Sequence, residues 1–180
     1  DEFTDIESCA FIDSTFDSIK ILWSETPINI QTSAFSALTV IEGFTIDREV
    51  TYYDFGDSES IIPYNEINTP FITLPVPDKI LVGMFVGCTV ENINFRTADG
   101  ITYEDKGVVK IPNGIDYIGE AAFDGVKGVR HLYIPFGVTQ IEKQAFAKWN
   151  TDQTIHTPFV SELHADGLLT HVWREECGAL

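Results

Sequence analysis

The residues best suited to acid–base or metal chemistry are the four histidines, His131, His156, His164 and His171. Zinc sites use His or Cys ligands at close spacings, because the donors must converge on one tetrahedron. The chain contains neither an HxxxH nor a CxxC motif. The sequence therefore predicts no metal site, and we expect His131 and His156 to be surface residues of strands.

An acidic stretch is the segment most suggestive of calcium. Asp54, Asp57 and Glu59 surround Gly56, and alternating oxygen ligands around a glycine suit a hard cation. The order differs from that of an EF-hand, and the distal glutamate is missing. We interpret the stretch as a solvated loop, with a calcium-dependent module as the alternative.

Motifs for nucleophilic catalysis are missing from the chain. No GxSxG or SxxK pattern occurs, and no serine triad order can be recognised. Paired carboxylates could process a glycan if they lay about 5–10 Å apart, but 28 acidic residues make such pairs common by chance. We therefore predict a protein that is not an enzyme and has no cofactor.

The chain has three cysteines, Cys9, Cys88 and Cys177. Three are few for a disulfide-stapled protein. Cys88 follows Phe85 at the spacing by which Val126 follows Phe123, so it is expected to pack as a small core residue. We predict free and mostly buried thiols.

The net charge of −17 limits the possible partners. Residues 1–70 hold 14 acidic and 2 basic side chains, and residues 71–180 hold 14 and 9. Such a field repels phosphate backbones and anionic membranes. No apolar run approaches the roughly 20 residues that span a bilayer. We expect a monomer that neither binds nucleic acid nor inserts into a membrane.

A sequence repeat organises the elements that must position these residues. Two segments match residue by residue at an offset of 23, with an Ile-Pro, an Ile and an Ala-Phe in each: residues 109–123 and residues 132–146. A period of about 20–29 residues with one short strand per unit is typical of a leucine-rich-repeat-like solenoid. Because one unit cannot bury its own apolar face, neighbouring units must stack to form a core.

The repeated pattern resembles the BspA-type leucine-rich repeat. Residues 101–158 carry the resemblance most strongly. The segment Asp99-Gly100-Ile101-Thr102-Tyr103 is similar to a hairpin that such proteins carry between repeats, and Asp-Gly favours a tight hairpin turn. The resemblance implies a curved stack of short parallel strands. It also implies adhesion or surface display, and hence an extracellular or cell-surface bacterial protein.

Weaker copies extend the repeat along the chain. An aliphatic or aromatic residue precedes a Phe by five positions in five segments: Phe11–Phe16, Ile30–Phe35, Ile80–Phe85, Ile118–Phe123 and Ile141–Phe146. Apolar residues also alternate in seven triplets: Ile21–Trp23, Phe44–Ile46, Ile72–Leu74, Ile93–Phe95, Val109–Ile111, Leu132–Ile134 and Ile155–Thr157. Alternation with a period of two predicts short strands whose outer residues face the core.

These patterns predict an α/β-type or mainly β repeat solenoid with little helix. We expect one leucine-rich-repeat domain over residues 1–180, with degenerate repeats in 1–70, clearer repeats in 71–158 and a C-terminal cap in 159–180. The irregular stretch between Ile46 and Phe71 fits only as a degenerate repeat with a loop. A cap is expected at an array's end because its last repeat has one face open to water.

The middle residues of the seven triplets should line up on the exposed sheet face: Leu22, Thr45, Thr73, Asn94, Lys110, Tyr133 and His156. The part of this face with the most aromatic and cation-capable side chains, and so the best suited to ligand binding, is Lys110, Tyr133 and His156, with His131 beside them. We expect a non-catalytic recognition module that binds a host or matrix protein or a glycan through this face. A structural spacer within a larger surface protein is the alternative, and a calcium-dependent or glycan-processing module is the third reading.

Overall fold

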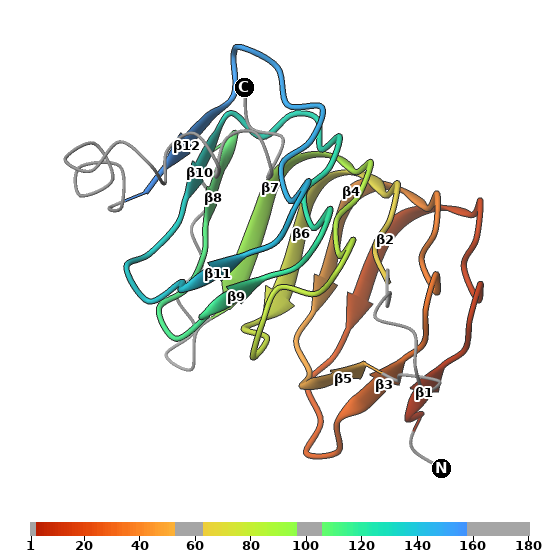
Figure 1. The fold of residues 1–180 in the computed structure, drawn as a ribbon. Helices are drawn as coiled ribbons and strands as arrows, with labels where there is room; N and C mark the ends of the chain where they lie inside the picture. The colour runs from red at the N-terminus through yellow and green to blue at the C-terminus, as the bar shows by residue number, and fades with distance from the viewer. Residues whose placement is uncertain (1–2, 53–62, 97–105, 158–180) are drawn as a thin grey trace, which may run out of the picture.

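A computed structural model of the chain describes residues 3–52, 63–96 and 106–157, which form a curved stack of parallel strands (Figure 1). All secondary structure in these ranges is β-strand, bridge or turn. No helix of the described part is long and apolar enough to cross a membrane. The predicted repeat solenoid is therefore confirmed, in its mainly β form.

The longer strands build one side of the solenoid. The strands β2 (Thr15–Ile21), β4 (Thr39–Ile46), β6 (Asn68–Pro75) and β7 (Thr89–Arg96) form a parallel sheet in that order. Next to β7 lies β8 (Val108–Lys110), which pairs with β10 (His131–Tyr133) and then β12 (Thr154–His156). Each strand pairs with the strand of the next turn, because the chain returns to the same side once per repeat.

Short strands build a second side. The strands β1 (Asp5–Ile6), β3 (Ile28–Ile30) and β5 (Val50–Tyr52) form one small parallel sheet, and β9 (Tyr117–Ile118) pairs with β11 (Gln140–Ile141). A parallel bridge joins Ile80 to Ile118. In the repeated pattern, the aliphatic residue thus lies on this second side, and the Phe five positions later lies in the turn that follows.

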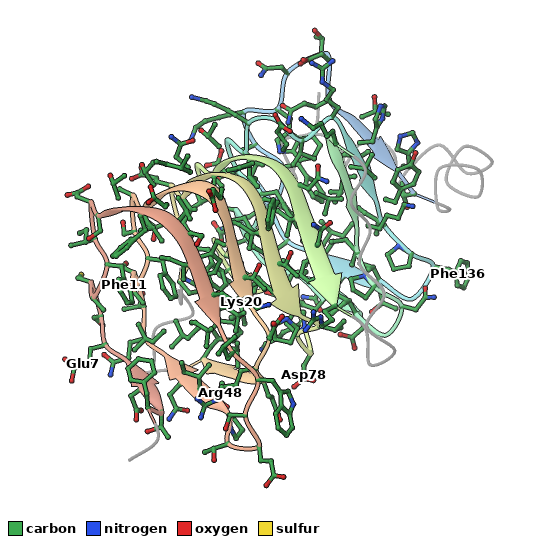
Figure 2. The ribbon with its side chains drawn as sticks, turned by 180° about the vertical axis from the view of Figure 1, so that it is seen from behind. Glu7, Phe11, Lys20, Arg48, Asp78 and Phe136 are labelled. Carbon is green, nitrogen blue, oxygen red and sulfur yellow. The ribbon has the colours of Figure 1, made fainter. Side chains whose placement is uncertain are left out.

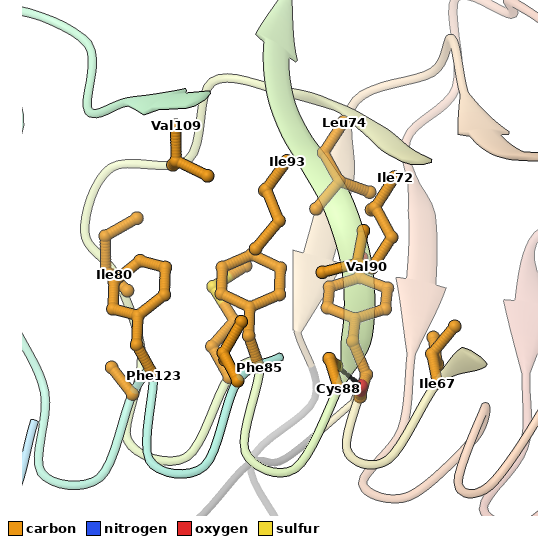
Figure 3. Packing of buried hydrophobic residues seen from close by; sticks show 14 of the residues in the cluster. Ile67, Ile72, Leu74, Ile80, Phe85, Cys88, Val90, Ile93, Val109 and Phe123 are labelled. Atoms are coloured by element: carbon orange, nitrogen blue, oxygen red, sulfur yellow. Dashed lines mark hydrogen bonds between the residues drawn. The ribbon is translucent and has the colours of Figure 1, made fainter. Parts of the chain in front are cut away.

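Stacked aromatic rings fill the core between the two sides. Adjacent rings are 5.3–5.9 Å apart between centroids and are tilted by 26° or less, in the order Phe11, Phe35, Tyr64, Phe85, Phe123 and Phe146. Figure 3 shows Phe85 and Phe123 side by side, each from its own turn. We call this series the aromatic ladder. The predicted stacking of Phe123 on Phe146 is confirmed, at 5.9 Å and 19°.

The first turn differs from its prediction. The aromatic ladder uses Phe11, five residues after the buried Ile6, whereas Phe16 lies in β2. Backbone pairing confirms this register, because the Phe11 amide donates to the Ala34 carbonyl at 2.9 Å. The predicted step from Phe11 to Phe16 is therefore wrong, and the step from Ile6 to Phe11 takes its place.

The strand triplet of the same turn is also shifted by two residues. Ile19, Lys20 and Ile21 pair with Phe44, Thr45 and Ile46. Trp23, which was expected to face the core, is 71% exposed, and Leu22 lies beyond the end of β2. A bulge in β4 lengthens the spacing between these turns, which a fixed period of 23 could not anticipate.

The alternation of the other strands follows the prediction on the core side. Leu132 and Ile134 are buried while Tyr133 between them is exposed. Thr73 and Asn94 are middle residues that were expected to face solvent, yet both are buried. Thr73 is flanked by Thr45 and Asn94 on neighbouring strands, and at a strand spacing of about 4.8 Å such neighbours shield short side chains.

The described residues of the irregular stretch after Ile46, residues 47–52 and 63–70, belong to the same stack. Tyr52 of β5 pairs with Ile30, and Tyr64 takes the ring position of the aromatic ladder. Several predicted features lie outside the described residues: the acidic stretch around Gly56, the hairpin at Asp99 to Tyr103, and the cap at 159–180 with His164, His171 and Cys177. The single domain over 1–180 therefore stays a prediction.

The two described cysteines are free thiols with different surroundings. Cys88 is buried as predicted, its Sγ donates to the Tyr64 carbonyl at 2.8 Å, and burial raises the pKa of its thiol to about 12. Cys9 is exposed, which corrects the expectation of a mostly buried thiol. It precedes the aromatic ladder's first ring at the N-terminal end of the stack, where no earlier turn among the described residues covers it.

Candidate functional site

The strands β8, β10 and β12 bring three candidate side chains into one row. Tyr133 of β10 pairs with Lys110 of β8 on one side and with His156 of β12 on the other. Residues at equal positions of parallel strands point to the same face of a sheet and lie about 4.8 Å apart. The offset of 23 in sequence therefore becomes a continuous row on the outer face.

Tyr133 and His156 form a stacked pair. Their ring centroids are 4.2 Å apart and their planes differ by 8°, while Tyr133 remains 40% exposed. One face of the tyrosine ring is therefore covered by imidazole. The ring edge and the hydroxyl are left to contact a ligand, and within the described ranges no residue forms a hydrogen bond with that hydroxyl.

A second histidine joins this pair. His131 Nδ1 lies 3.1 Å from His156 Nε2, and the two ring centroids are 5.3 Å apart. One nitrogen must donate and the other accept, so at least one of the two rings is neutral while the bond exists. The bond holds His156 against Tyr133, and the three rings form one connected group. We call Lys110, Tyr133, His156 and His131 the sheet-face site.

The structure brings all four predicted site residues together. The close approach of the two histidines was not predicted, because His131 and Tyr133 are neighbours in β10 and only pairing with β12 places His156 across from them. Among the described residues, no group of three His, Cys, Asp or Glu side chains could hold a metal ion. The four side chains of the site present hydrogen-bonding groups and an aromatic edge at the surface.

The other end of the row has a different chemistry. Lys20 takes the position that was predicted for Leu22, and it lies near the end of β2 (Figure 2). Its Nζ lies 3.3 Å from Asp47, which also pairs with Arg96 at 2.7 Å. These charges satisfy one another across the sheet. The sheet-face site is thus the part of the row that combines an exposed aromatic ring with imidazoles.

Sequence reasoning missed one further group of charged residues. Lys106, Lys127 and Arg130 line a cleft where β8 and β10 begin. They are far apart in sequence from the acidic residue Glu91 that also lines it. Their spacing in the chain follows no ligand-binding motif, so only the folded structure reveals the cleft.

The comparisons with known proteins agree with the fold. The family model of the BspA type leucine rich repeat region matches six copies, over residues 1–70 and 107–164. The searches of curated proteins and of solved structures found no match. The family match spans more than half of the chain, and the stacked turns have the geometry that such repeats require. The chain therefore belongs to the BspA-type leucine-rich repeat family.

Proposed function

We propose that this protein is a non-catalytic recognition module, secreted or displayed on a cell surface, that binds a protein or glycan through the sheet-face site. The observation that carries the proposal is the exposed Tyr133 held against His156. A ring that is already fixed loses little conformational entropy when a ligand binds. Its partly open edge then presents a phenol and imidazole donors together.

Lys110 and the histidines define the chemistry of the ligand. Tyrosine hydroxyl and imidazole nitrogens both donate and accept hydrogen bonds, and the Lys110 ammonium adds a positive charge. A polar ligand with hydroxyl or carboxylate groups suits this set. Because His156 covers one ring face at 4.2 Å, the ligand makes edge contacts and hydrogen bonds rather than stacking on that face.

The repeat scaffold supports a binding role. Solenoids present extended faces to partners, and families with this architecture commonly serve as scaffolds for recognition. We expect the module to act as a monomer on a protein or glycan, without nucleic acid, a cofactor or insertion into a membrane. The net charge of −17 disfavours phosphate backbones as ligands.

A structural spacer within a larger surface protein is the second candidate. The pairing of Lys20 and Arg96 with Asp47 favours it, because these charges bind one another instead of a partner. A spacer needs no exposed aromatic site. The sheet-face site therefore separates the two candidates.

The test screens the chain on a glycan array and against immobilised matrix proteins. For the ligand found, Tyr133→Ala should weaken binding by about 2 kcal/mol, which is roughly 30-fold, without lowering the melting temperature much. Trp23→Ala, an exposed aromatic at the far end of the stack, is the matched control and should leave affinity unchanged. Equal affinities of wild type and Tyr133→Ala would place the site elsewhere. A protein that captures no ligand would favour the spacer.

A further inference from the structure

A cleft of about 400 Å³ opens at the edge of the solenoid, where β8, β10 and β12 begin. Lys106 and Gly107 precede β8, Arg130 precedes β10, and Asp152 precedes β12, and all of them line the cleft. None of the residues of the sheet-face site lines it. The cleft is therefore a separate surface.

Two cations in this cleft have no counter-ion within the described part of the chain. The other described Lys and Arg side chains are engaged: for example, Lys148 pairs with Asp124 at 2.9 Å, and Lys79 lies over the Tyr117 ring. Lys127 and Arg130 form no ion pair or side-chain hydrogen bond with a described residue. In a chain with 28 acidic and 11 basic residues, two cations that line one cleft without a described counter-ion are available to bind an external anion.

The backbone holds both cations in place. The Lys127 amide donates to the Cys88 carbonyl at 2.8 Å, and the Lys127 carbonyl accepts from Val90 at 2.8 Å. The Arg130 amide donates to Gly107, and its carbonyl accepts from Thr154, both at 2.7 Å. Lys127 is thus anchored to one neighbouring turn and Arg130 to two, so the backbone that carries both cations is held by hydrogen bonds.

Gly107 makes room for the arginine. A Cβ atom at this position would lie 3.3 Å from Arg130 Cγ, which is closer than ordinary van der Waals contact. The absence of a side chain at residue 107 lets the alkyl stem of Arg130 lie against the backbone of the neighbouring turn. This contact orders the stem and leaves the guanidinium at its exposed end.

The rest of the lining is polar. Lys106 and Glu91 pair with each other at 3.2 Å and so contribute little net charge. Gln153 is fixed, because its Nε2 donates to the carbonyls of Val126 and Val129. Asp152 is exposed and, within the described part of the chain, has no cation within ion-pair distance. The cleft thus offers two positive charges for an oxyanion and one carboxylate that can accept hydrogen bonds from hydroxyl groups.

The absence of an apolar anchor point argues against a peptide ligand. Val129 is the one apolar side chain of the lining and is itself buried, whereas peptide recognition relies on pockets for aromatic or aliphatic anchors. A sugar needs hydrogen-bonding groups, and an acidic sugar also needs cations. We propose that this cleft binds a saccharide that carries a carboxylate or sulfate group, with Arg130 and Lys127 holding the oxyanion and Asp152 accepting from a hydroxyl. The planar guanidinium of Arg130 can hold such an anion through two parallel hydrogen bonds.

Isothermal titration of the whole chain tests the proposal. Three probes are tetrasaccharides of equal length: one of galacturonate, one of neutral galactose, and one of galactose sulfated at O6. Tetraglutamate is the fourth probe, because it offers carboxylates without sugar hydroxyls. We expect at least one anionic saccharide to bind and neutral galactose to bind at least about tenfold more weakly, since a charged hydrogen bond contributes about 1.5–3 kcal/mol.

Three variants locate the site. The double substitution Lys127→Gln and Arg130→Gln should weaken the anionic saccharide by at least about tenfold. Lys143→Gln is the matched control, because Lys143 is an exposed lysine that pairs with Glu120 outside the cleft; it should change affinity by less than about twofold. Tyr133→Ala reports on the sheet-face site, so saccharide binding that this variant loses and the double variant keeps belongs to the sheet-face site and counts against the cleft.

Several results would overturn the proposal. These are unchanged affinity in the double variant, binding of neutral galactose as tight as that of both anionic saccharides, or tighter binding of tetraglutamate than of both anionic saccharides. Absence of binding by any anionic saccharide up to about 10 mM, beyond the millimolar range of weak specific binding, would do so as well. Both substituted cations are exposed, so the double variant should keep the wild-type melting temperature, which a thermal scan checks.

Discussion

Removal of one ring from the aromatic ladder gives the sharpest test of the packing. Phe123 is buried, and its ring stacks on Phe85 at 5.4 Å and on Phe146 at 5.9 Å. Truncation of a buried Phe to Ala costs about 3–5 kcal/mol, and each stacked pair adds about 0.5–1.5 kcal/mol beyond burial. Since Phe123→Ala loses two such pairs, we expect a loss near the upper end, at about 4–5 kcal/mol.

The backbone contacts of this position survive the change. The Phe123 amide donates to the Ala145 carbonyl, and its own carbonyl accepts from Trp149 Nε1, both at 2.8 Å. An alanine keeps both bonds, so the measured loss belongs to the ring. Phe123→Leu keeps most of the buried volume and loses only the stacking, so it should cost about 1–2 kcal/mol.

Urea unfolding followed by tryptophan fluorescence measures these losses, because Trp149 packs edge-on against Phe146. The control is Phe136→Ala, whose ring is 68% exposed and projects outward (Figure 2); it should change stability by less than about 0.5 kcal/mol. If Phe123→Ala lost less than about 1 kcal/mol, the turns would be able to close around the gap, and the argument that the ladder holds them together would be refuted. A weaker dependence of the free energy of unfolding on urea concentration in the variant would indicate that the turns unfold separately.

Two further predictions concern alkaline pH and a close backbone contact. Burial raises the pKa of Tyr52 and Tyr64 above the ordinary 10, and that of Cys88 from 9 to about 12. The unfolded chain therefore releases these protons first, so the contribution of these three groups to the free energy of unfolding should be constant well below pH 9 and fall above it. Urea titrations at rising pH measure this fall, and Cys88→Ala should remove the part that begins at pH 9; an unchanged profile in that variant would contradict the assignment. At Gly128, a Cβ atom would lie 2.4 Å from the Val90 carbonyl oxygen, so Gly128→Ala should cost about 2 kcal/mol or more. Gly114 has a similar φ of +100° but no atom within 4 Å of a Cβ, so Gly114→Ala measures the backbone strain alone; equal losses in the two variants would show that the close contact does not matter.

The clear repeats could be predicted because their pattern is local. Each turn needs an aliphatic residue, a small residue and an aromatic ring at constant spacing, so that rings of successive turns meet. This logic found Phe85, Phe123 and Phe146. It also found the turn from Ile80 to Phe85, which lies in the region 71–106 that the family model does not match.

The first turn could not be predicted in the same way. Both Phe11 and Phe16 follow an apolar residue by five positions, so the local pattern admits either as the ring of the aromatic ladder. Phe11 is the correct residue because Ile6 pairs with Ile30, and the same offset of 24 carries Phe11 onto Phe35. The pairing of β2 with β4 then includes a bulge, which moves the register of the strand that follows. A bulge depends on how two strands fit together, which a repeat period does not encode.

The sequence by itself determined the period, and a constant offset of 23 was enough to place Lys110, Tyr133 and His156 in one row. Tertiary structure alone decided what that row can do. It brought His131 within 3.1 Å of His156, and it paired Lys106 with Glu91 while leaving Lys127 and Arg130 beside the cleft without a described counter-ion. The physical reason is that a repeat period specifies which residues share a strand position, whereas hydrogen bonds and ion pairs depend on distances of 3–4 Å between side chains of different turns.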